Sequence, residues 1–156
     1  MTRRGSIAYY LAGVVCGSFF FSASYYAYFV IAKGASSRNW GRDFLFVYFL
    51  TALFGFLPQL LGAWLLRRIA TRFAWTTMLS WLLGGSAVFV VIVWGVGQLG
   101  LLVERWQLPL SVKASLMSAL FGPMFVALQP LWVPIPAAAA TAWVLFTVHR
   151  AFAERQ

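Results

Sequence analysis

The sequence predicts an all-α integral membrane protein: a four-pass transmembrane helical bundle with a proline-broken fourth segment, forming a single transmembrane domain over residues 1–156. The first observation behind this prediction is composition, because 62% of the residues are apolar and only 10% are charged. Soluble proteins carry roughly 25% charged residues, so this chain has too few charges to cover a surface in water. The second observation is that the charges flank four runs without any charged residue or histidine: Gly5–Ala32, Phe44–Leu66, Phe73–Val103 and Ala114–Val148.

Each uncharged run is long enough to cross a bilayer. About 20 residues at 1.5 Å per residue cross a hydrocarbon core that is roughly 30 Å thick. Backbone polar groups in lipid have to be hydrogen-bonded within the segment, which favours helices. We therefore expect passes at approximately 7–32, 44–66, 75–103 and 131–150. The first pass is too long for the apolar core of a signal peptide, so we interpret it as an uncleaved helix.

The fourth run differs from the others in length and in proline content. Its 35 residues would form a helix of about 52 Å, nearly twice what the bilayer needs. It contains four prolines: Pro123, Pro130, Pro134 and Pro136. The last three remove backbone donors within seven residues, so we expect the helix to break there and carbonyls near Leu131 to lose their partners. Either a partial or interfacial helix at approximately 111–128 precedes the crossing helix at 131–150, or both pieces cross and there are five passes.

The distribution of charge predicts the surroundings and the orientation of the helices. The net charge is +9, but the basic residues stand in short clusters at the ends of the uncharged runs. Such clusters contact anionic lipid headgroups, and no basic groove for nucleic acid is expected. With four passes and both termini in the cytoplasm, seven lysines and arginines lie inside and five outside. This small bias favours an inner (plasma) membrane protein with cytoplasmic N- and C-termini, whereas five passes would place the N-terminus outside.

Small residues four positions apart predict where helices approach one another. Gly13 and Gly17 form such a pair in the first run, and Ser80 and Gly84 form another in the third. Small side chains let two helix backbones come close together inside a membrane. We expect these four residues at helix–helix contacts, either within the bundle or with a partner.

The residues that carry most enzyme chemistry are scarce. The chain has one histidine, His149, and one cysteine, Cys16, and its three acidic residues all flank the runs. Paired-histidine haem ligation, serine–histidine catalysis and zinc binding therefore lack their side chains. Proton-coupled carriers generally need a carboxylate within the membrane, and none is expected here. We predict no catalytic residue, no enzyme activity, no cofactor and no metal site.

Two glutamines are the polar residues of most interest within the runs. Gln59 and Gln129 each lie about fifteen residues into a run, and the two runs should travel in the same direction. Both glutamines adjoin a proline, in Pro58-Gln59 and Gln129-Pro130. A buried amide is unfavourable unless it is hydrogen-bonded, so each needs a partner. The pair forms either a small polar site at one depth or hydrogen-bonded links within the bundle.

Two functions remain open from the sequence. The first is an accessory or assembly subunit that acts through helix–helix contacts with other membrane proteins or with itself. The second is a minimal oligomeric transporter or channel with a polar site near the broken fourth segment. Leu57–Leu61, followed by Arg67 and Arg68, resembles the proline–glutamine signature of the PQ-loop sugar and amino-acid transporters. The similarity covers less than a tenth of the chain, and Gly62–Trp64 stands where that family has a polar residue.

Overall fold

The computed structural model describes residues 3–33, 40–117 and 130–153, and these ranges contain helices and no strand. The helices are α1 (Arg3–Lys33), α2 (Trp40–Phe54), α3 (Phe56–Arg72), α4 (Met78–Arg105) and α6 (Pro134–Ala153). Residues 110–117 are also helical. The all-helical prediction is therefore confirmed.

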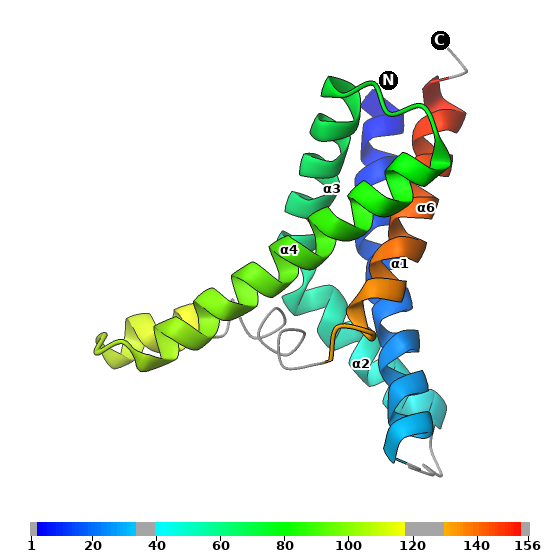
Figure 1. Cartoon of the computed structure of the whole chain (residues 1–156). Helices are drawn as coiled ribbons and strands as arrows, with labels where there is room; N and C mark the ends of the chain where they lie inside the picture. Colours follow the sequence, from blue (N-terminus) through cyan, green and yellow to red (C-terminus); the bar gives the residue numbers. More distant parts are fainter. Residues whose placement is uncertain (1–2, 34–39, 118–129, 154–156) are drawn as a thin grey trace.

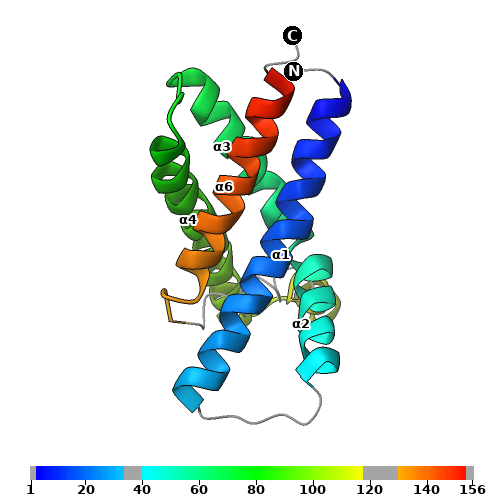
Figure 2. The same ribbon diagram turned by 90° about the vertical axis from the view of Figure 1, so that its right-hand side faces the viewer.

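Three of the helices form the centre of the bundle. α1, α3 and α6 lie side by side, α2 lies beside the later half of α1, and α4 crosses α6 and α3 before it extends away from them (Figures 1 and 2). The start of α1 and the end of α6 lie at the same end of the bundle as the end of α3. A Cβ atom added to Gly5 would lie 2.9 Å from the ring of Phe152, so the start of α1 and the end of α6 are in contact.

The described helices support two or three membrane spans. Gly5–Ile31 and Met78–Arg105 are long and apolar enough to cross a membrane by themselves. α2 and α3 meet the same criterion only as a pair, and they are bent by 65°. The second expected pass is therefore not one straight helix, and the four-pass arrangement is not shown. The part of the expected helix at 111–128 that follows residue 117 lies outside the described residues.

The bend between α2 and α3 is located at Gly55. This residue has φ −87° and ψ −3°, and its N–H still donates to the Thr51 carbonyl at 2.9 Å. A Cβ atom on Gly55 would collide with that carbonyl oxygen. Pro58 lies in the first turn of α3, where the missing N–H has no intrahelical acceptor to lose. The bend therefore needs a residue without a side chain at position 55.

The chain is not helical over residues 130–133, before α6, but the carbonyls of Pro130 and Leu131 are paired. The Pro130 carbonyl accepts from the Val133 N–H at 2.9 Å, and the Leu131 carbonyl accepts from the Ile135 N–H at 3.0 Å. The expectation of an unpaired Leu131 carbonyl is wrong because Pro134 begins α6. Proline at the first position of a helix loses no hydrogen bond, and its fixed φ suits that position.

The core is made of small residues and large rings from α1, α3, α4 and α6. Its fully buried members include Tyr9, Leu66, Trp81 and Leu145. The Trp81 indole donates to the Trp75 carbonyl at 3.0 Å, so its polar atom has a partner inside the core. Large apolar side chains elsewhere face outward, as expected where lipid is the solvent.

Two glycines of α4 provide a matched test of this packing. A Cβ atom at Gly85 would lie 2.5 Å from the Ala142 Cβ atom, whereas one at Gly95 would meet nothing within 4 Å. We expect Gly85→Ala to lower the free energy of unfolding by about 1–3 kcal/mol because α4 and α6 have to separate. Gly95→Ala should leave it unchanged or raise it by up to about 1 kcal/mol, since alanine favours helices. Unfolding by SDS in mixed micelles measures both, and equal effects would contradict the observed crossing.

Candidate functional site

α1 and α3 run antiparallel in a register set by polar contacts. Hydrogen bonds join them at three successive turns of α3: Arg67 Nη1 to Ser6 Oγ (3.1 Å), the Tyr9 hydroxyl to the Ala63 carbonyl (3.3 Å) and Gln59 Nε2 to Ser18 Oγ (3.1 Å). The first bond lies near the chain ends and the last lies beside the bend at Gly55. Polar contacts therefore hold this helix pair over its whole length.

Gln59 is the centre of a polar cluster at the end of this contact that lies beside the bend at Gly55. Only 7% of its surface is exposed, although its side chain ends in a polar amide group. Its Nε2 donates to Ser18 Oγ, and the Ser18 hydroxyl lies 3.3 Å from Oε1, to which it can donate in return. Nε2 also lies 3.5 Å from the Thr51 carbonyl oxygen across the bend. The amide therefore has partners on two other segments, which offsets the unfavourable burial of its polar atoms.

Gly13 and Gly17 let three helices meet at this cluster. A Cβ atom on Gly17 would lie 3.0 Å from Gln59 Oε1 on α3 and 3.7 Å from Thr141 Cγ2 on α6. One turn earlier, a Cβ atom on Gly13 would lie 3.2 Å from the Ala63 Cβ atom. Both glycines thus lie on the face of α1 that packs against α3 and α6. The close approach of the backbones brings the Gln59 amide within reach of Ser18.

Two further buried hydroxyl groups belong to the same region. Thr141 is almost fully buried, and its hydroxyl donates to the Ala137 carbonyl of its own helix at 2.7 Å. Its methyl group, Cγ2, faces Gly17 and would lie 3.7 Å from a Cβ atom there. Ser22 lies one turn after Ser18 and is also fully buried, and its Oγ has no hydrogen-bond partner within the described part of the chain.

The second predicted pair of small residues has a different role. The Ser80 N–H lies 3.3 Å from Thr77 Oγ1 and the Ser80 hydroxyl donates to the Thr77 carbonyl at 2.7 Å, so both residues cap the start of α4. A Cβ atom on Gly84 would overlap the ring of Trp75 from the preceding connection. The glycine of α4 that meets α6 is Gly85, the next residue.

The predicted pairing of Gln59 with Gln129 involves a residue, Gln129, that lies outside the described residues. The structure instead joins Gln59 to Ser18 and to the Thr51 carbonyl. Neither Ser18 nor the bend at Gly55 was predicted from the sequence. The sequence signal that could have been used is the spacing of four residues on both helices, as in Gly13 and Gly17 of α1 and Gln59 and Ala63 of α3. Once one contact between the helices is known, this spacing gives the others.

The chemistry available at the cluster is hydrogen bonding. An amide, hydroxyl groups and backbone carbonyls can donate and accept, but none of them exchanges a proton easily near neutral pH. Among the residues that the structure describes, no three His, Cys, Asp or Glu side chains are grouped to hold a metal ion. Comparisons of the chain with protein-family models, with curated proteins and with solved structures found no match.

A double-mutant cycle measures what the Ser18–Gln59 contact contributes. We expect Ser18→Ala and Gln59→Leu to lower the free energy of unfolding separately, each by about 1–3 kcal/mol, because each leaves a buried polar partner unpaired. The double variant should lose less than the sum, with a coupling of about 0.6–2 kcal/mol. Gln59→Leu combined with Thr147→Val, at an exposed position of α6, is the control and should be additive. Additive losses for Ser18 and Gln59 would show that the two side chains do not interact.

Proposed function

We propose that the chain is an accessory or assembly subunit of the cell inner (plasma) membrane that binds a larger membrane protein through helix–helix contacts. The observation that carries this proposal is that the buried amide of Gln59 is bonded within the chain, to Ser18 and to the Thr51 carbonyl. A side chain held in this way stabilises the bundle and is not available to a passing substrate. The polar groups around Gln59 therefore favour a structural function over a transport function.

The outer faces suit such a partner. No residue of α2 is buried within the described chain, although this helix is almost entirely apolar. Leu45, Phe49 and Leu53 follow one another at intervals of four, with exposures of 53%, 65% and 72%. Residues at this spacing form one stripe along a helix, the pattern by which helices pack against each other. We call these three residues the α2 stripe and assign it to partner contact.

The proposed orientation places the chain ends in the cytoplasm. Arg67, Arg68 and Arg72 lie towards the end of α3, at the same end of the bundle as the start of α1 and the end of α6. Arg68 lies over the Trp64 ring at 5.2 Å, an arrangement suited to the membrane surface. Clustered arginines at one end favour the cytoplasmic side and contact with anionic headgroups. Thiol labelling of Arg68→Cys from each side of the membrane checks this orientation.

A minimal oligomeric transporter or channel is the second candidate. The 65° bend between α2 and α3 favours it, because broken helices at membrane depth form binding sites in transporters. In such a protein the bend should line a path that water can enter. Gln59 lies just beyond the bend with 7% of its surface exposed, which favours the accessory function over this one.

Purification from native membranes in mild detergent separates the two candidates. We expect a larger membrane protein to co-purify in fixed stoichiometry. Phe49→Ala with Leu53→Ala should lower its recovery about tenfold, as for loss of contact residues worth 1–2 kcal/mol together. The control is Leu83→Ala, at a similarly exposed position of α4, which should leave recovery unchanged. A homo-oligomer that catalyses flux in vesicles, with flux lost in a folded Gln59→Leu variant, would contradict the accessory function.

A further inference from the structure

One face of α3 carries side chains whose order matches the layers of a phospholipid. From the bend towards the end of the helix, this face presents Leu57, Leu61, Trp64, Arg68 and Arg72, all of which are exposed. Residues three or four positions apart lie on the same side of a helix, so the five form a row. We call them the α3 outer row. Apolar side chains come first in this row, an aromatic ring follows, and two cations end it.

The row is about as long as one leaflet of a bilayer is deep. The rise from Leu57 to Arg68 is about 16–17 Å along the helix axis. Half of a hydrocarbon core that is roughly 30 Å thick is about 15 Å. α3 lies alongside α1, which is a candidate span, so its axis follows the direction of crossing (Figure 2). With the bend at Gly55 near the middle of the membrane, the two arginines lie at the level of lipid phosphates.

The guanidinium group of Arg68 is held against the ring of Trp64. Its central carbon lies over that ring, 5.2 Å from the centroid. A cation–π contact uses the flat face of the guanidinium group, so the N–H groups in its plane can still donate to a phosphate. Arg72 follows one turn later, in the last turn of α3. Both guanidinium groups can therefore reach the same phosphate group.

The neighbouring arginine has a different role. Arg67 is half-buried, and its Nη1 donates to Ser6 Oγ at 3.1 Å, which joins α3 to α1. Two adjacent arginines thus serve separate contacts, one inside the bundle and one at its outer surface. The charge of Arg68 remains where a membrane lipid can approach it.

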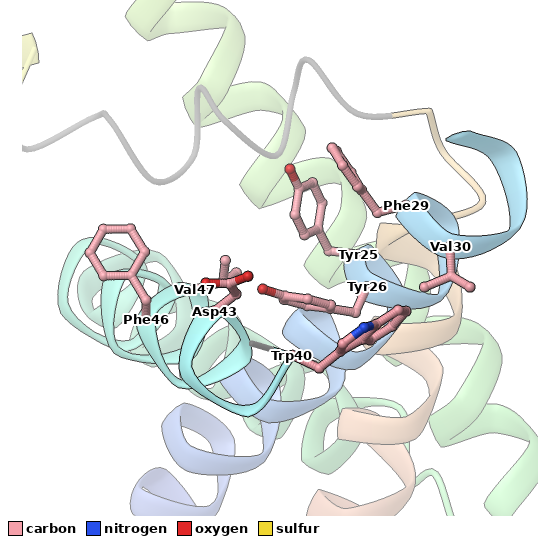
Figure 3. Close-up of a pocket in the computed structure, with 8 residues that line it drawn as sticks. All are labelled: Tyr25, Tyr26, Phe29, Val30, Trp40, Asp43, Phe46 and Val47. Carbon is pink, nitrogen blue, oxygen red and sulfur yellow. The ribbon is translucent and has the colours of Figure 1, made fainter. Parts of the chain in front are cut away.

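Acidic side chains of the described residues lie away from this end of the bundle. They are Asp43, in the first turn of α2, and Glu104, near the end of α4. Both helix ends are far from the end of α3 (Figure 1). A cavity of about 270 Å³ between α1 and the start of α2 has Asp43 in its wall and no lysine or arginine (Figure 3). An anionic group therefore suits the end of α3 and not this cavity.

We propose that the α3 outer row binds one acidic phospholipid, with the phosphate between Arg68 and Arg72 and an acyl chain along the apolar part of the row. The planar fork of arginine matches phosphate oxygens and forms charge-assisted hydrogen bonds with them. A zwitterionic lipid fits less well, because its ammonium group would lie near two guanidinium groups. The proposal is independent of the accessory function, since it needs only a membrane that contains acidic lipid.

Diffuse attraction is the competing explanation for arginines at a helix end. Basic residues near the membrane surface orient helices and attract acidic headgroups without holding any one of them. Such attraction depends on the number of charges and not on their positions. It predicts no fixed stoichiometry, and it predicts equal effects for equally exposed arginines.

Native mass spectrometry of the protein purified in a maltoside detergent and titrated with phosphatidylglycerol counts the bound lipids. We expect one saturable site, with an affinity at least about tenfold above that for phosphatidylcholine with the same acyl chains. Arg68→Gln and Arg72→Gln should each weaken binding about fivefold. Arg68→Lys keeps the charge but loses the planar fork, so it should also weaken binding. The matched control Arg105→Gln removes an exposed arginine from the end of α4 and should keep full affinity.

A second pair of variants tests the aromatic ring. Trp64→Leu should weaken binding about two- to fivefold because Arg68 loses its support. Trp143→Leu removes a similarly exposed ring from α6 and should have no effect.

Three results would overturn the proposal, each in variants that elute as folded protein. The first is equal affinity for the two lipids. The second is a loss for Arg105→Gln as large as that for Arg68→Gln, which diffuse attraction predicts. The third is displacement of the lipid by glycerol 3-phosphate at the same concentration, which would show that the acyl chain contributes nothing to binding.

Discussion

The need to hydrogen-bond a buried amide determines how the centre of this bundle is arranged. Gln59 lies in an apolar segment where an unpaired amide would be strongly unfavourable. Its partners are Ser18 on α1 and the Thr51 carbonyl across the bend. Each requires a glycine nearby: Gly17 lets α1 approach, and Gly55 lets the chain turn without a side chain against the Thr51 carbonyl. The bend and the contact between α1 and α3 thus meet at one side chain.

The class of fold was predictable because charge and hydropathy act over whole segments. α1 begins and ends within four residues of the first expected pass, and α4 begins three residues after the third. The bend at Gly55 was not predictable, since glycine is frequent in membrane helices and does not by itself mark a break. The prolines indicated a break in the helix, and residues 130–133 before α6 are not helical. Their effect on the carbonyls depended on Pro134 being the first residue of α6, a boundary that composition does not fix.

The site was predictable only in part. Gln59 stood out because an amide is rare in an apolar run, and Gly13 and Gly17 stood out by their spacing. Ser18 did not, because serine is small and weakly polar and its partner lies 41 residues away in sequence. Gly85 was passed over for its neighbour Gly84, since a spacing of four alone cannot tell which of two adjacent glycines faces α6. The roles of Ser18 and Gly85 depend on how two helices far apart in the sequence align with each other. The local sequence pattern contains no information about that alignment.

A disulfide between α1 and α3 tests the central contact most directly. In a Cys16→Ala background, we expect Gly13→Cys and Ala63→Cys to cross-link in native membranes, because their Cβ atoms would lie 3.2 Å apart. Disulfides need Cβ atoms about 3.5–4.5 Å apart, which a small adjustment provides. Gly13→Cys with Leu61→Cys, at an exposed position two residues earlier on α3, should not cross-link. Cross-linking of the second pair and not the first would contradict the packing of α1 against α3 around Gln59.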